Sequence, residues 1–302
     1  VESLTPEMLR KGAWKGKFFR TSDLNIKPES LIAGRKHFYY EFLQDTRKKL
    51  ANLGFEEMQG PMVVNEFWNF DALFQPQFHA AREWTDTYRV KNKLQLNKKD
   101  LVFIDEEIME RVKTEHELKW KYNWNYEKAS QFILRPQGTV LSVLQMASKI
   151  SKLKIPGKYF AISRCFRPDI VDTSHLTEFN QLEGIIVGKN LNFKNLLSIL
   201  ESITKKLVQV DKIKFKPDYY PFTEPSVELD VSKDGRWIEL GGAGIFRDSV
   251  ISPLIPEDKK ENIKVLAWGL GIDRIAMLKF GLQDIRELFS KKLEFLRAMK
   301  IR

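Results

Sequence analysis

The stretch at positions 164–184, R-C-F-R-P-D-I-V-D-T-S-H-L-T-E-F-N-Q-L-E-G, constrains the fold of this chain more than any other. Two segments with extended character, 164–167 and 177–184, flank a charged loop at 169–175. This arrangement predicts a β-hairpin in which Arg167 lies at the bend.

The predicted hairpin presents four different chemical groups on one surface. Side chains two positions apart share a face of a strand, so Phe179, Gln181 and Glu183 are predicted to point the same way. Together with the Arg167 guanidinium, this surface suits a ligand that carries a phosphate, a flat base and an ammonium group. The alternative interpretation is an amphipathic hairpin whose polar face only meets water.

A second motif, L-A-W-G-L-G-I-D-R-I-A-M-L-K-F-G at 266–281, favours the ligand-binding interpretation. The small residues Ala267, Gly269 and Gly271 allow a ligand to approach the backbone. Arg274 falls in the first turn of the helix that follows. A short strand, tight glycines and an arginine at a helix start are typical of a phosphate or nucleotide site.

The two motifs together resemble motifs 2 and 3 of class II aminoacyl-tRNA synthetases. H-L-T-E-F-N-Q-L-E-G and G-L-G-I-D-R-I-A-M-L-K-F-G-L-Q-D-I-R-E-L-F are similar to the α (catalytic) subunit of phenylalanyl-tRNA synthetases of the archaeal and eukaryotic type. The segments at 67–77, 220–228 and 237–247 extend the resemblance over nearly the whole chain. It implies an α+β fold, the class II catalytic fold, with a mostly antiparallel sheet flanked by helices.

By this resemblance, the expected activity is that of a phenylalanine–tRNA ligase. The enzyme would activate L-phenylalanine with ATP and transfer it to tRNA(Phe), and neither step needs a protein nucleophile because catalysis rests on positioning and on stabilising phosphate charge. Two alternatives stay open: a class II synthetase of different amino-acid specificity, and a non-catalytic synthetase-like module that binds an amino acid or a nucleotide.

The resemblance also assigns roles around the nucleotide. Arg167 would hold the α-phosphate through its bidentate fork, and His175 would contact the β- and γ-phosphates. Phe179 and Arg274 would enclose the adenine between them. Asp169 stands where the family often has glutamate in contact with adenine. Arg167, Arg274 and His175 are thus the expected catalytic residues.

Two glutamates are expected to serve a magnesium ion, which requires oxygen ligands. By resemblance, Glu224 in F-T-E-P is a ligand near the partner subunit. Glu239 in W-I-E-L-G-G resembles the class-wide acidic residue before motif 3, and it would also contact ATP. The alternative for either glutamate is a carboxylate that neutralises a nearby arginine.

The amino-acid pocket is expected to join a polar end to an apolar slot. Its expected members are Thr139, Gln137, Gln181, Glu183, Phe222, Phe246, Ala267 and Gly269. Gln181 and Glu183 would bind the ammonium group, and the aromatic and small residues would form the slot. The string L-R-P-Q-G-T at 134–139 departs from the Leu-Arg-Thr-His-Thr usual in the family. It resembles the Leu-Arg-Pro-Glu-Gly-Thr of the histidyl, prolyl and threonyl enzymes.

The composition is compatible with a polyanionic partner. Fifty Lys and Arg residues against forty Asp and Glu give a net charge of +10, which favours RNA. The single Cys165 excludes an internal disulfide framework and fits the reducing cytoplasm, where we expect the protein. No apolar run reaches the roughly 18 residues of a membrane span. Val1 in place of methionine suggests that the natural N-terminus is missing.

The resemblance implies partners and a division of the chain. The partners would be a phenylalanyl-tRNA synthetase β subunit, in an α2β2 assembly, together with tRNA(Phe), ATP and L-phenylalanine. Residues 1–35 are expected to be a basic, irregular N-terminal arm, and residues 36–302 the catalytic domain. A helix at 36–53 and a strand at 55–64 containing Pro61 resemble the subunit-contact motif of the class; an ordinary helix–strand pair fits them equally well.

Hydrophobic spacing predicts the remaining elements. The aromatic-rich segment at 67–77 is predicted to be core, and in the family it lies beside the active site. Trp120, Tyr122, Trp124 and Tyr126 alternate as in a half-buried strand; an aromatic platform for RNA bases is the alternative. Helices are predicted at 192–208 and 285–301, and strands at 212–216, 226–231 and 236–240 with a turn at Asp234-Gly235.

Overall fold

The computed structural model describes residues 3–19, 34–91, 102–147, 153–256 and 259–299. These residues form two compact units, Val1–Lys36 and His37–Arg302. The described part of the smaller unit contains one short helix, α1 (Pro6–Arg10), which is capped by the side chain of Thr5. Most of the remaining residues of the expected irregular arm, 20–33, lie outside the described residues.

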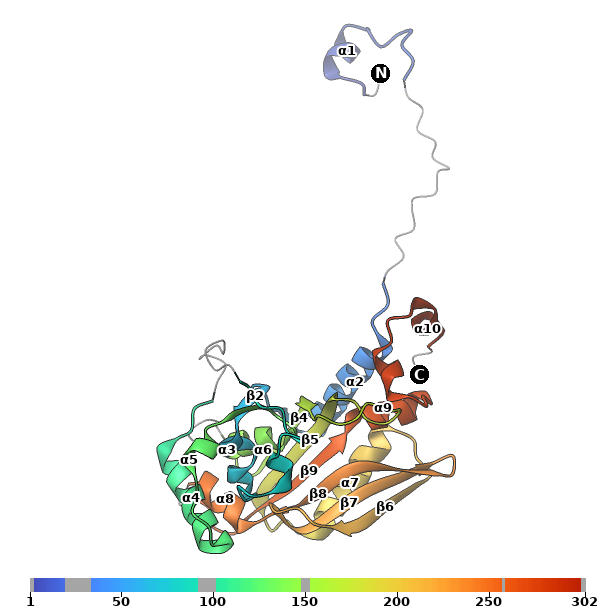
Figure 1. Ribbon diagram of the computed structural model, residues 1–302. Helices are drawn as coiled ribbons and strands as arrows, with labels where there is room; N and C mark the ends of the chain where they lie inside the picture. The colour runs from blue at the N-terminus through green and yellow to red at the C-terminus, as the bar shows by residue number, and fades with distance from the viewer. Residues whose placement is uncertain (1–2, 20–33, 92–101, 148–152, 257–258, 300–302) are drawn as a thin grey trace. The chain divides into compact units, whose positions relative to one another are not determined.

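The larger unit is organised by a seven-stranded sheet with the strand order β1-β4-β5-β9-β8-β7-β6 (Figure 1). Every neighbouring pair is antiparallel except β1 and β4. This sheet and its flanking helices confirm the predicted α+β class. In sheet order the strands are β1 (Glu56–Glu57), β4 (Gly157–Phe166), β5 (Glu178–Lys189), β9 (Ile263–Gly271), β8 (Arg236–Phe246), β7 (Thr223–Lys233) and β6 (Lys212–Asp218).

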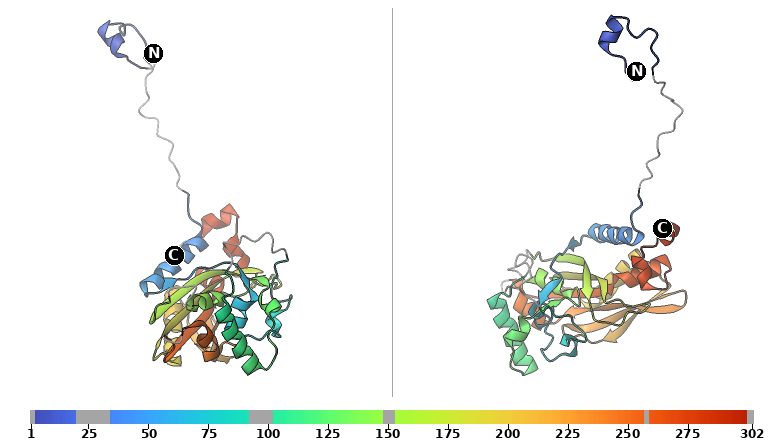
Figure 2. Two further views of the ribbon diagram at one scale, coloured as in Figure 1. Left: turned by 90° about the vertical axis from the view of Figure 1, so that its left-hand side faces the viewer. Right: turned by 45° about the horizontal axis from the view of Figure 1, so that its top comes forward.

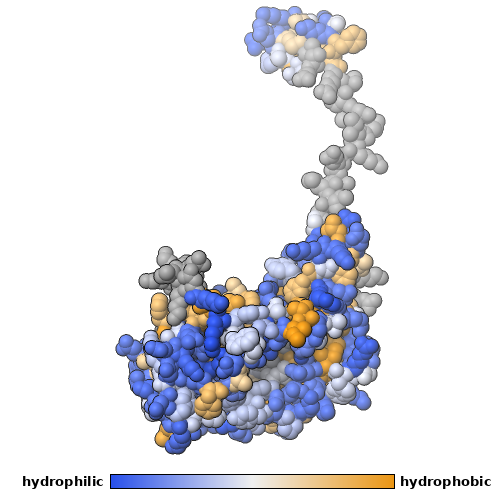
Figure 3. All heavy atoms as spheres, viewed as in Figure 1, coloured by the Kyte–Doolittle hydropathy of each residue, from blue (hydrophilic) through white to orange (hydrophobic). Residues whose placement is uncertain are grey.

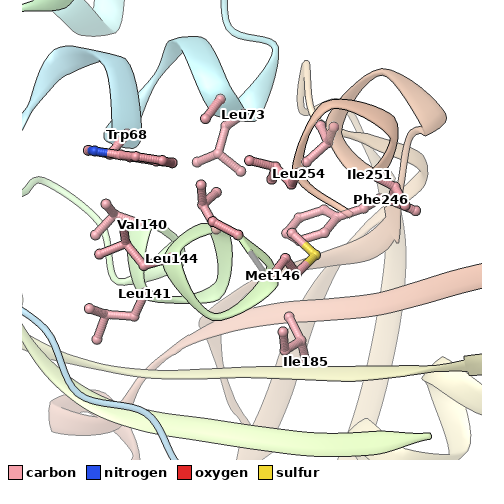
Figure 4. Packing of buried hydrophobic residues seen from close by; sticks show 14 of the residues in the cluster. Trp68, Leu73, Val140, Leu141, Leu144, Met146, Ile185, Phe246, Ile251 and Leu254 are labelled. Atoms are coloured by element: carbon pink, nitrogen blue, oxygen red, sulfur yellow. The ribbon is translucent and has the colours of Figure 1, made fainter. Parts of the chain in front are cut away.

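Each face of the sheet is covered by its own hydrophobic core, because side chains alternate along a strand. On β5, Ile185 and Val187 face the first core, whereas Leu182 and Ile186 face the second. The first core packs against α3 (Glu66–Asn69), η1 (Asp71–Leu73), α4 (Glu106–Trp120), α5 (Tyr126–Ala129), α6 (Thr139–Met146) and α8 (Asp248–Leu254). Figure 4 shows the side chains of α6 and α8 packed above Ile185.

The second core joins the sheet to α2 (Phe38–Asn52), α7 (Phe193–Leu207), α9 (Ile272–Phe280), η6 (Ile285–Phe289) and α10 (Leu293–Ala298). Figure 2 shows α2 beside the C-terminal segment that begins with α9. Phe38 of α2 meets Phe280 of α9 edge to face, with ring centroids 4.9 Å apart. The N-terminal helix of this unit therefore packs directly on the helix that carries the second sequence motif.

Several sequence predictions are confirmed by these elements. Helix α7 begins after Asn192, whose side chain forms a reciprocal capping box with Asn195. Strands β7 and β8 are joined by Asp234 and Gly235, which both have the positive φ of a tight hairpin turn. Helix α2 (Phe38–Asn52) lies within the predicted range 36–53.

The predicted strand at 55–64 is wrong as a single element. It is divided between β1 in the large sheet and β2 (Val63–Asn65), which pairs with β3 (Phe132–Leu134) in a separate two-stranded sheet. Gly60 and Pro61 redirect the chain between them, and their carbonyls both accept hydrogen bonds from Arg135 Nη1 at 3.2 and 3.1 Å. Proline lacks the amide hydrogen that a continuous ladder would need.

Two further predictions are corrected by the structure. The alternating aromatics at 120–126 do not form a strand: α4 ends at Trp120, and Lys121 takes the left-handed conformation. The indole nitrogens of Trp120 and Trp124 instead donate to Phe74 O and Asp71 Oδ1. The predicted helix at 285–301 is divided into η6 and α10, because η6 ends at Phe289 and is followed by Ser290 with φ −59° and ψ 136°. Positions 300–301 lie outside the described residues.

The outer face of the larger unit in Figure 3 is mainly hydrophilic, with hydrophobic side chains scattered between charged ones. Within the described ranges, no helix combines the length and the apolar character that a membrane crossing requires.

Candidate active-site cleft

A cleft of about 550 Å³ opens on the sheet face that carries the first core. Its walls come from β5, β8, β9, the start of α6, the loop after β4 and the segment 219–223. All but one of the predicted site residues line it: Arg167, Asp169, His175, Phe179, Gln181, Glu183, Gln137, Thr139, Phe222, Phe246, Ala267, Gly269, Glu239 and Arg274. The exception is Glu224.

The first arginine of the cleft is held at the mouth of the β4–β5 hairpin. The backbone nitrogen of Arg167 donates to Thr177 O at 3.0 Å, immediately beyond the end of β4. Its Nε donates to Pro136 O at 3.0 Å. Its guanidinium carbon lies 5.0 Å from the centroid of the Phe179 ring, a cation–π distance. The remaining guanidinium nitrogens of Arg167 are suited to a phosphate.

The second arginine reaches the cleft from the first turn of α9. Arg274 Nη1 donates to Glu239 O at 3.0 Å and lies 3.6 Å from Glu239 Oε1. Its Nη2 lies 3.2 Å from His175 Nε2. Since a guanidinium only donates, His175 accepts at Nε2 and carries its proton on Nδ1, which is 3.0 Å from Asp172 Oδ2. Hydrogen bonds from Ser174 and His175 hold the pKa of Asp172 below its usual range.

At the opposite end of the cleft lies a carboxylate that is completely buried. Glu183 Oε1 accepts from Ser142 Oγ at 2.8 Å, and Oε2 accepts from Gln181 Nε2 at 2.9 Å and Thr139 Oγ1 at 3.2 Å. Among the described residues, no lysine or arginine pairs with it. Burial raises the pKa of Glu183 to about 8 although its three hydrogen bonds act to lower it. A cationic group of a ligand would favour the ionised form of Glu183 and so lower this pKa.

Two glycines permit the close packing of this buried end. A Cβ at Gly138 would lie 2.3 Å from Ser163 Oγ and 3.3 Å from Glu183 Cβ. A Cβ at Gly269 would lie 2.1 Å from Gln181 Nε2. Glycine at these positions therefore lets the amide of Gln181 and the carboxylate of Glu183 lie against the backbone of their neighbours.

An apolar slot continues from this polar end. The rings of Phe222 and Phe246 meet edge to face at 6.3 Å, and Tyr220 stacks on Phe222 at 5.8 Å. Phe246 and Ala267 are buried, whereas Phe222 is half-buried. These residues all line the cleft, so an aromatic side chain of a ligand could extend the same ring packing.

The two predicted magnesium ligands lie in different places. Glu224 lines a second cavity and pairs with Arg247 Nη2 at 2.8 Å, whereas Glu239 lines the cleft with a side chain that is 52% exposed. No group of three or more His, Cys, Asp or Glu side chains suited to a metal occurs in the described part of the chain. Mg²⁺ typically binds one or two carboxylates together with substrate phosphates. Glu239 fits such a shared site.

One wall of the cleft includes Gln75, His79 and Asp86; the resemblance placed the segment at 67–77 beside the active site, but His79 and Asp86 were not predicted. This wall is fixed from behind by Arg82, which is 2% exposed. Arg82 pairs with Asp71 at 2.9 Å and donates to the carbonyl of Gln75 at 2.5 Å. The dense aromatic segment at 67–77 that ends in Gln-Pro-Gln was the signal for this wall, although core packing was the predicted role.

Comparisons with known proteins agree with this architecture. Residues 21–299 match the family model described as "tRNA synthetases class II core domain (F)". The chain is 14% identical to the crystal structure of pyrrolysyl-tRNA synthetase from Desulfitobacterium hafniense, with a TM-score of 0.58 over 88% of this chain and 78% of that one. This likeness shows the class II fold.

The curated relatives share more of the sequence. The chain is 45% identical over 309 residues to the phenylalanine–tRNA ligase alpha subunit of Thermococcus gammatolerans, covering 100% of this chain and 59% of that protein. The corresponding subunit of Treponema pallidum is 40% identical over 305 residues, covering 98% of this chain and 53% of that protein. The chain thus spans little more than half the length of these relatives. By the match over almost its whole length, it belongs to the class II tRNA synthetase core domain (F) family.

Proposed function

We propose that this chain is the catalytic portion of the α subunit of a phenylalanine–tRNA ligase. The observation that carries the proposal is a single cleft with an exposed and a half-buried arginine at one end and a buried carboxylate with an apolar slot at the other. This order of groups matches an aminoacyl-adenylate, in which a phosphate separates a base from an amino acid. The names of the curated relatives support phenylalanine as that amino acid.

The proposed first step is formation of phenylalanyl-adenylate. An oxygen of the amino-acid carboxylate forms a bond to the α-phosphorus of ATP, and the bond from that phosphorus to the bridging oxygen breaks, so that pyrophosphate leaves with the electron pair. Arg167 stabilises the charge on the α-phosphoryl group, because its guanidinium is held at the cleft by Pro136 O and the Phe179 ring.

His175 and Arg274 act at the outer end of the nucleotide. Arg274 and Phe179 hold the adenine between them, and Asp169 lies at the same end of the cleft. His175 exchanges its contact with Arg274 for the β- and γ-phosphates. Magnesium neutralises phosphate charge when bound, and Glu239 would be its protein ligand in the cleft. Glu224, which lines a different cavity, would be a magnesium ligand near the partner subunit.

The amino acid is held at the buried end. Glu183 and Gln181 receive its ammonium group, and Thr139 and Gln137 complete the polar surround. Gln137 is fixed by its own hydrogen bond to Asn69 O at 3.1 Å. The phenyl ring lies between Phe222, Phe246, Ala267 and the backbone of Gly269. In the second step, a ribose hydroxyl at the 3′ end of tRNA(Phe) attacks the adenylate carbonyl and AMP leaves.

The remaining proposals concern the setting of the reaction. Residues 36–302 form the catalytic domain and residues 1–35 a basic arm. The partner is a β subunit in an α2β2 assembly; the relatives are themselves named as alpha subunits, which supports a second kind of chain. We place the enzyme in the cytoplasm.

The test is amino-acid-dependent exchange of pyrophosphate into ATP. The complete α chain, co-expressed with the proposed β subunit, is assayed with each of the twenty amino acids. Exchange with phenylalanine above all others supports the proposal. Exchange with a different amino acid would reassign the specificity, and no exchange with any amino acid would support a non-catalytic binding module.

A further inference from the structure

A buried polar cluster borders the nucleotide end of the cleft, and two of its members, Asn180 and Asp273, line the cleft itself. It joins Tyr39 of α2, Asn180 of β5 and Asp273 of α9, which are 5%, 5% and 2% exposed. The Tyr39 hydroxyl donates to Asp273 Oδ1. Asn180 Nδ2 donates to Tyr39 Oη at 2.8 Å and lies 3.2 Å from Asp273 Oδ1. Three elements distant in the sequence are therefore fixed by one set of hydrogen bonds.

The register of the sheet shows what Asp273 replaces. The last residue pair between β5 and β9 is Gln181 opposite Gly271, after which β9 ends and α9 begins. The backbone nitrogen of Asn180, one position beyond that pair, donates to Asp273 Oδ2 at 2.9 Å. The carboxylate thus takes the place of the strand carbonyl that is no longer available. It ties the first turn of α9 to the edge of β5.

Both anchors of this cluster adjoin residues that we propose contact the nucleotide. Asn180 lies between Phe179 and Gln181 in β5, and Asp273 immediately precedes Arg274 in α9. The distance between the Phe179 ring and the Arg274 guanidinium depends on how β5 and α9 are held together. An apolar contact could join the two elements at a lower desolvation cost. Hydrogen bonds depend on direction as well as on distance, so they also fix the orientation of β5 and α9 relative to each other.

A charged residue, Arg164, also contacts the cluster. Arg164 of β4 donates from Nε to Asn180 Oδ1 at 2.9 Å and forms an ion pair with Glu178. It orients the Asn180 amide so that the amide nitrogen, and not its oxygen, faces Tyr39 and Asp273. The cluster therefore has a defined hydrogen-bond direction from Arg164 to Asp273.

We propose that Tyr39, Asn180 and Asp273 are positioning residues that set the spacing of the adenine-binding pair Phe179 and Arg274. This inference rests on the proposed function, since it concerns the ATP end of the same cleft. It assigns α2 a role in nucleotide binding although no residue of α2 lines the cleft. The amino-acid end, which is built from β5, α6 and β9, should be independent of it.

The test compares the KM for ATP with the KM for phenylalanine in the exchange reaction. Tyr39→Phe removes the hydroxyl but keeps the ring packed against Phe289, and Asp273→Asn replaces one acceptor by a donor. Each variant should raise the KM for ATP roughly tenfold, as expected for a lost hydrogen bond to a charged group. The KM for phenylalanine should change less than about twofold. The double variant should be less impaired than the product of the two single effects.

Thr46→Ala is the matched control. Thr46 is also buried on α2, and its hydroxyl has no hydrogen-bond partner among the described residues. This change should lower the melting temperature without altering the ratio of the two KM values. If Tyr39→Phe and Asp273→Asn raise both KM values equally, or neither, the cluster is merely structural and the inference is wrong. If Asp273→Asn does not fold, Tyr39→Phe decides alone.

Calorimetric binding of α,β-methylene-ATP separates this inference from the proposed function. Wild-type protein that binds the analogue but exchanges no pyrophosphate would contradict the proposed activity only. Weaker binding of the analogue by Tyr39→Phe, with Thr46→Ala unchanged, would still support the positioning role. Equal binding by all three proteins would overturn it.

Discussion

At the amino-acid end of the cleft, Glu183 is completely buried, and its hydrogen bonds come from neutral groups of α6 and of its own strand β5. At the nucleotide end, the side chains of Arg274 and His175 are 24% and 45% exposed, and they contact each other. The first end already has its hydrogen bonds, and an ammonium group of a ligand would favour the ionised form of Glu183 there. The second end has polar contacts that a ligand must displace.

Because of this difference, the buried end is suited to specific recognition of one ligand group, and the exposed end is suited to a ligand that changes during the reaction. At the amino-acid end, called the dry end because Glu183 is fully buried, an opposite charge nearby is strongly favourable and a like charge strongly unfavourable, because the surrounding dielectric is low. The closely packed glycines also leave the side chains little freedom. At the nucleotide end, called the wet end because its side chains are partly exposed, individual contacts are weak because water screens them. The arginine side chains there can therefore adjust their positions as the phosphates of the ligand react. The two ends should therefore respond very differently to substitution, to pH and to salt.

The largest effect is expected for Arg167→Ala. Loss of the guanidinium removes a charge-stabilising donor at the reacting phosphate, and such changes typically slow catalysis about 100- to 1000-fold. Exchange kinetics should show this loss mainly in kcat while the melting temperature stays close to that of the wild type. The control is Arg236→Ala, which removes an exposed arginine bound to Gln283 outside the cleft. Unchanged turnover of Arg167→Ala would refute the role of this residue.

The next effect concerns the buried end. Glu183→Gln keeps the shape but cannot neutralise an ammonium group, and an unpaired buried charge costs about 2–5 kcal/mol. The KM for phenylalanine should rise at least about thirtyfold, with a far smaller change in the KM for ATP. Glu201→Gln, at an exposed ion pair on α7, is the control. Equal increases in both KM values would show that the amino-acid end and the nucleotide end of the cleft do not act independently.

The same residue predicts a pH dependence of stability. Burial raises the pKa of Glu183 from its ordinary 4.5 to about 8, so between these values the folded state binds more protons than the unfolded state. Stability contributed by the protonated form is therefore lost as pH rises through this window, by up to about 1.4 kcal/mol per pH unit. This loss is measured by comparing the free energy of urea unfolding at pH 5 and at pH 8 for the wild type and for Glu183→Gln. Identical changes in the two proteins would contradict a buried, protonated Glu183.

The smallest effect is expected for His175→Ala. This side chain is exposed and its contact with Arg274 is screened, so the KM for ATP should rise no more than about fivefold. Asp172→Asn removes the charged acceptor that contacts His175 Nδ1, and it should also raise the KM for ATP. An increase in the KM for ATP as large as the increase in the KM for phenylalanine caused by Glu183→Gln would mean that contacts at the nucleotide end are as strong as those at the amino-acid end.

The sequence predicted those parts of the site that depend on local spacing. Phe179, Gln181 and Glu183 share a face because a strand has a period of two, and Arg274 follows a strand end that glycines mark. Both features are visible within about ten residues. The hairpin and the helix that carry them were predicted for the same reason.

What could not be predicted depends on partners far apart in the chain. Ser142 and Thr139 bury Glu183 from a helix some forty residues earlier, and no local pattern marks them. Tyr39 reads as one more apolar position of a helical stripe, although it bonds to Asp273 across the fold. The predicted strand at 55–64 failed because Arg135 binds the carbonyls at its centre. Tertiary contacts outweighed local preference at each of these positions.

The most direct test of a single cleft with a wet and a dry end is a crystal structure with a non-hydrolysable phenylalanyl-adenylate analogue. The account predicts the ammonium group at Glu183, the phenyl ring between Phe222 and Ala267, and the phosphate at Arg167. An analogue bound in the reverse direction, or a slot filled by the protein's own side chains, would contradict it.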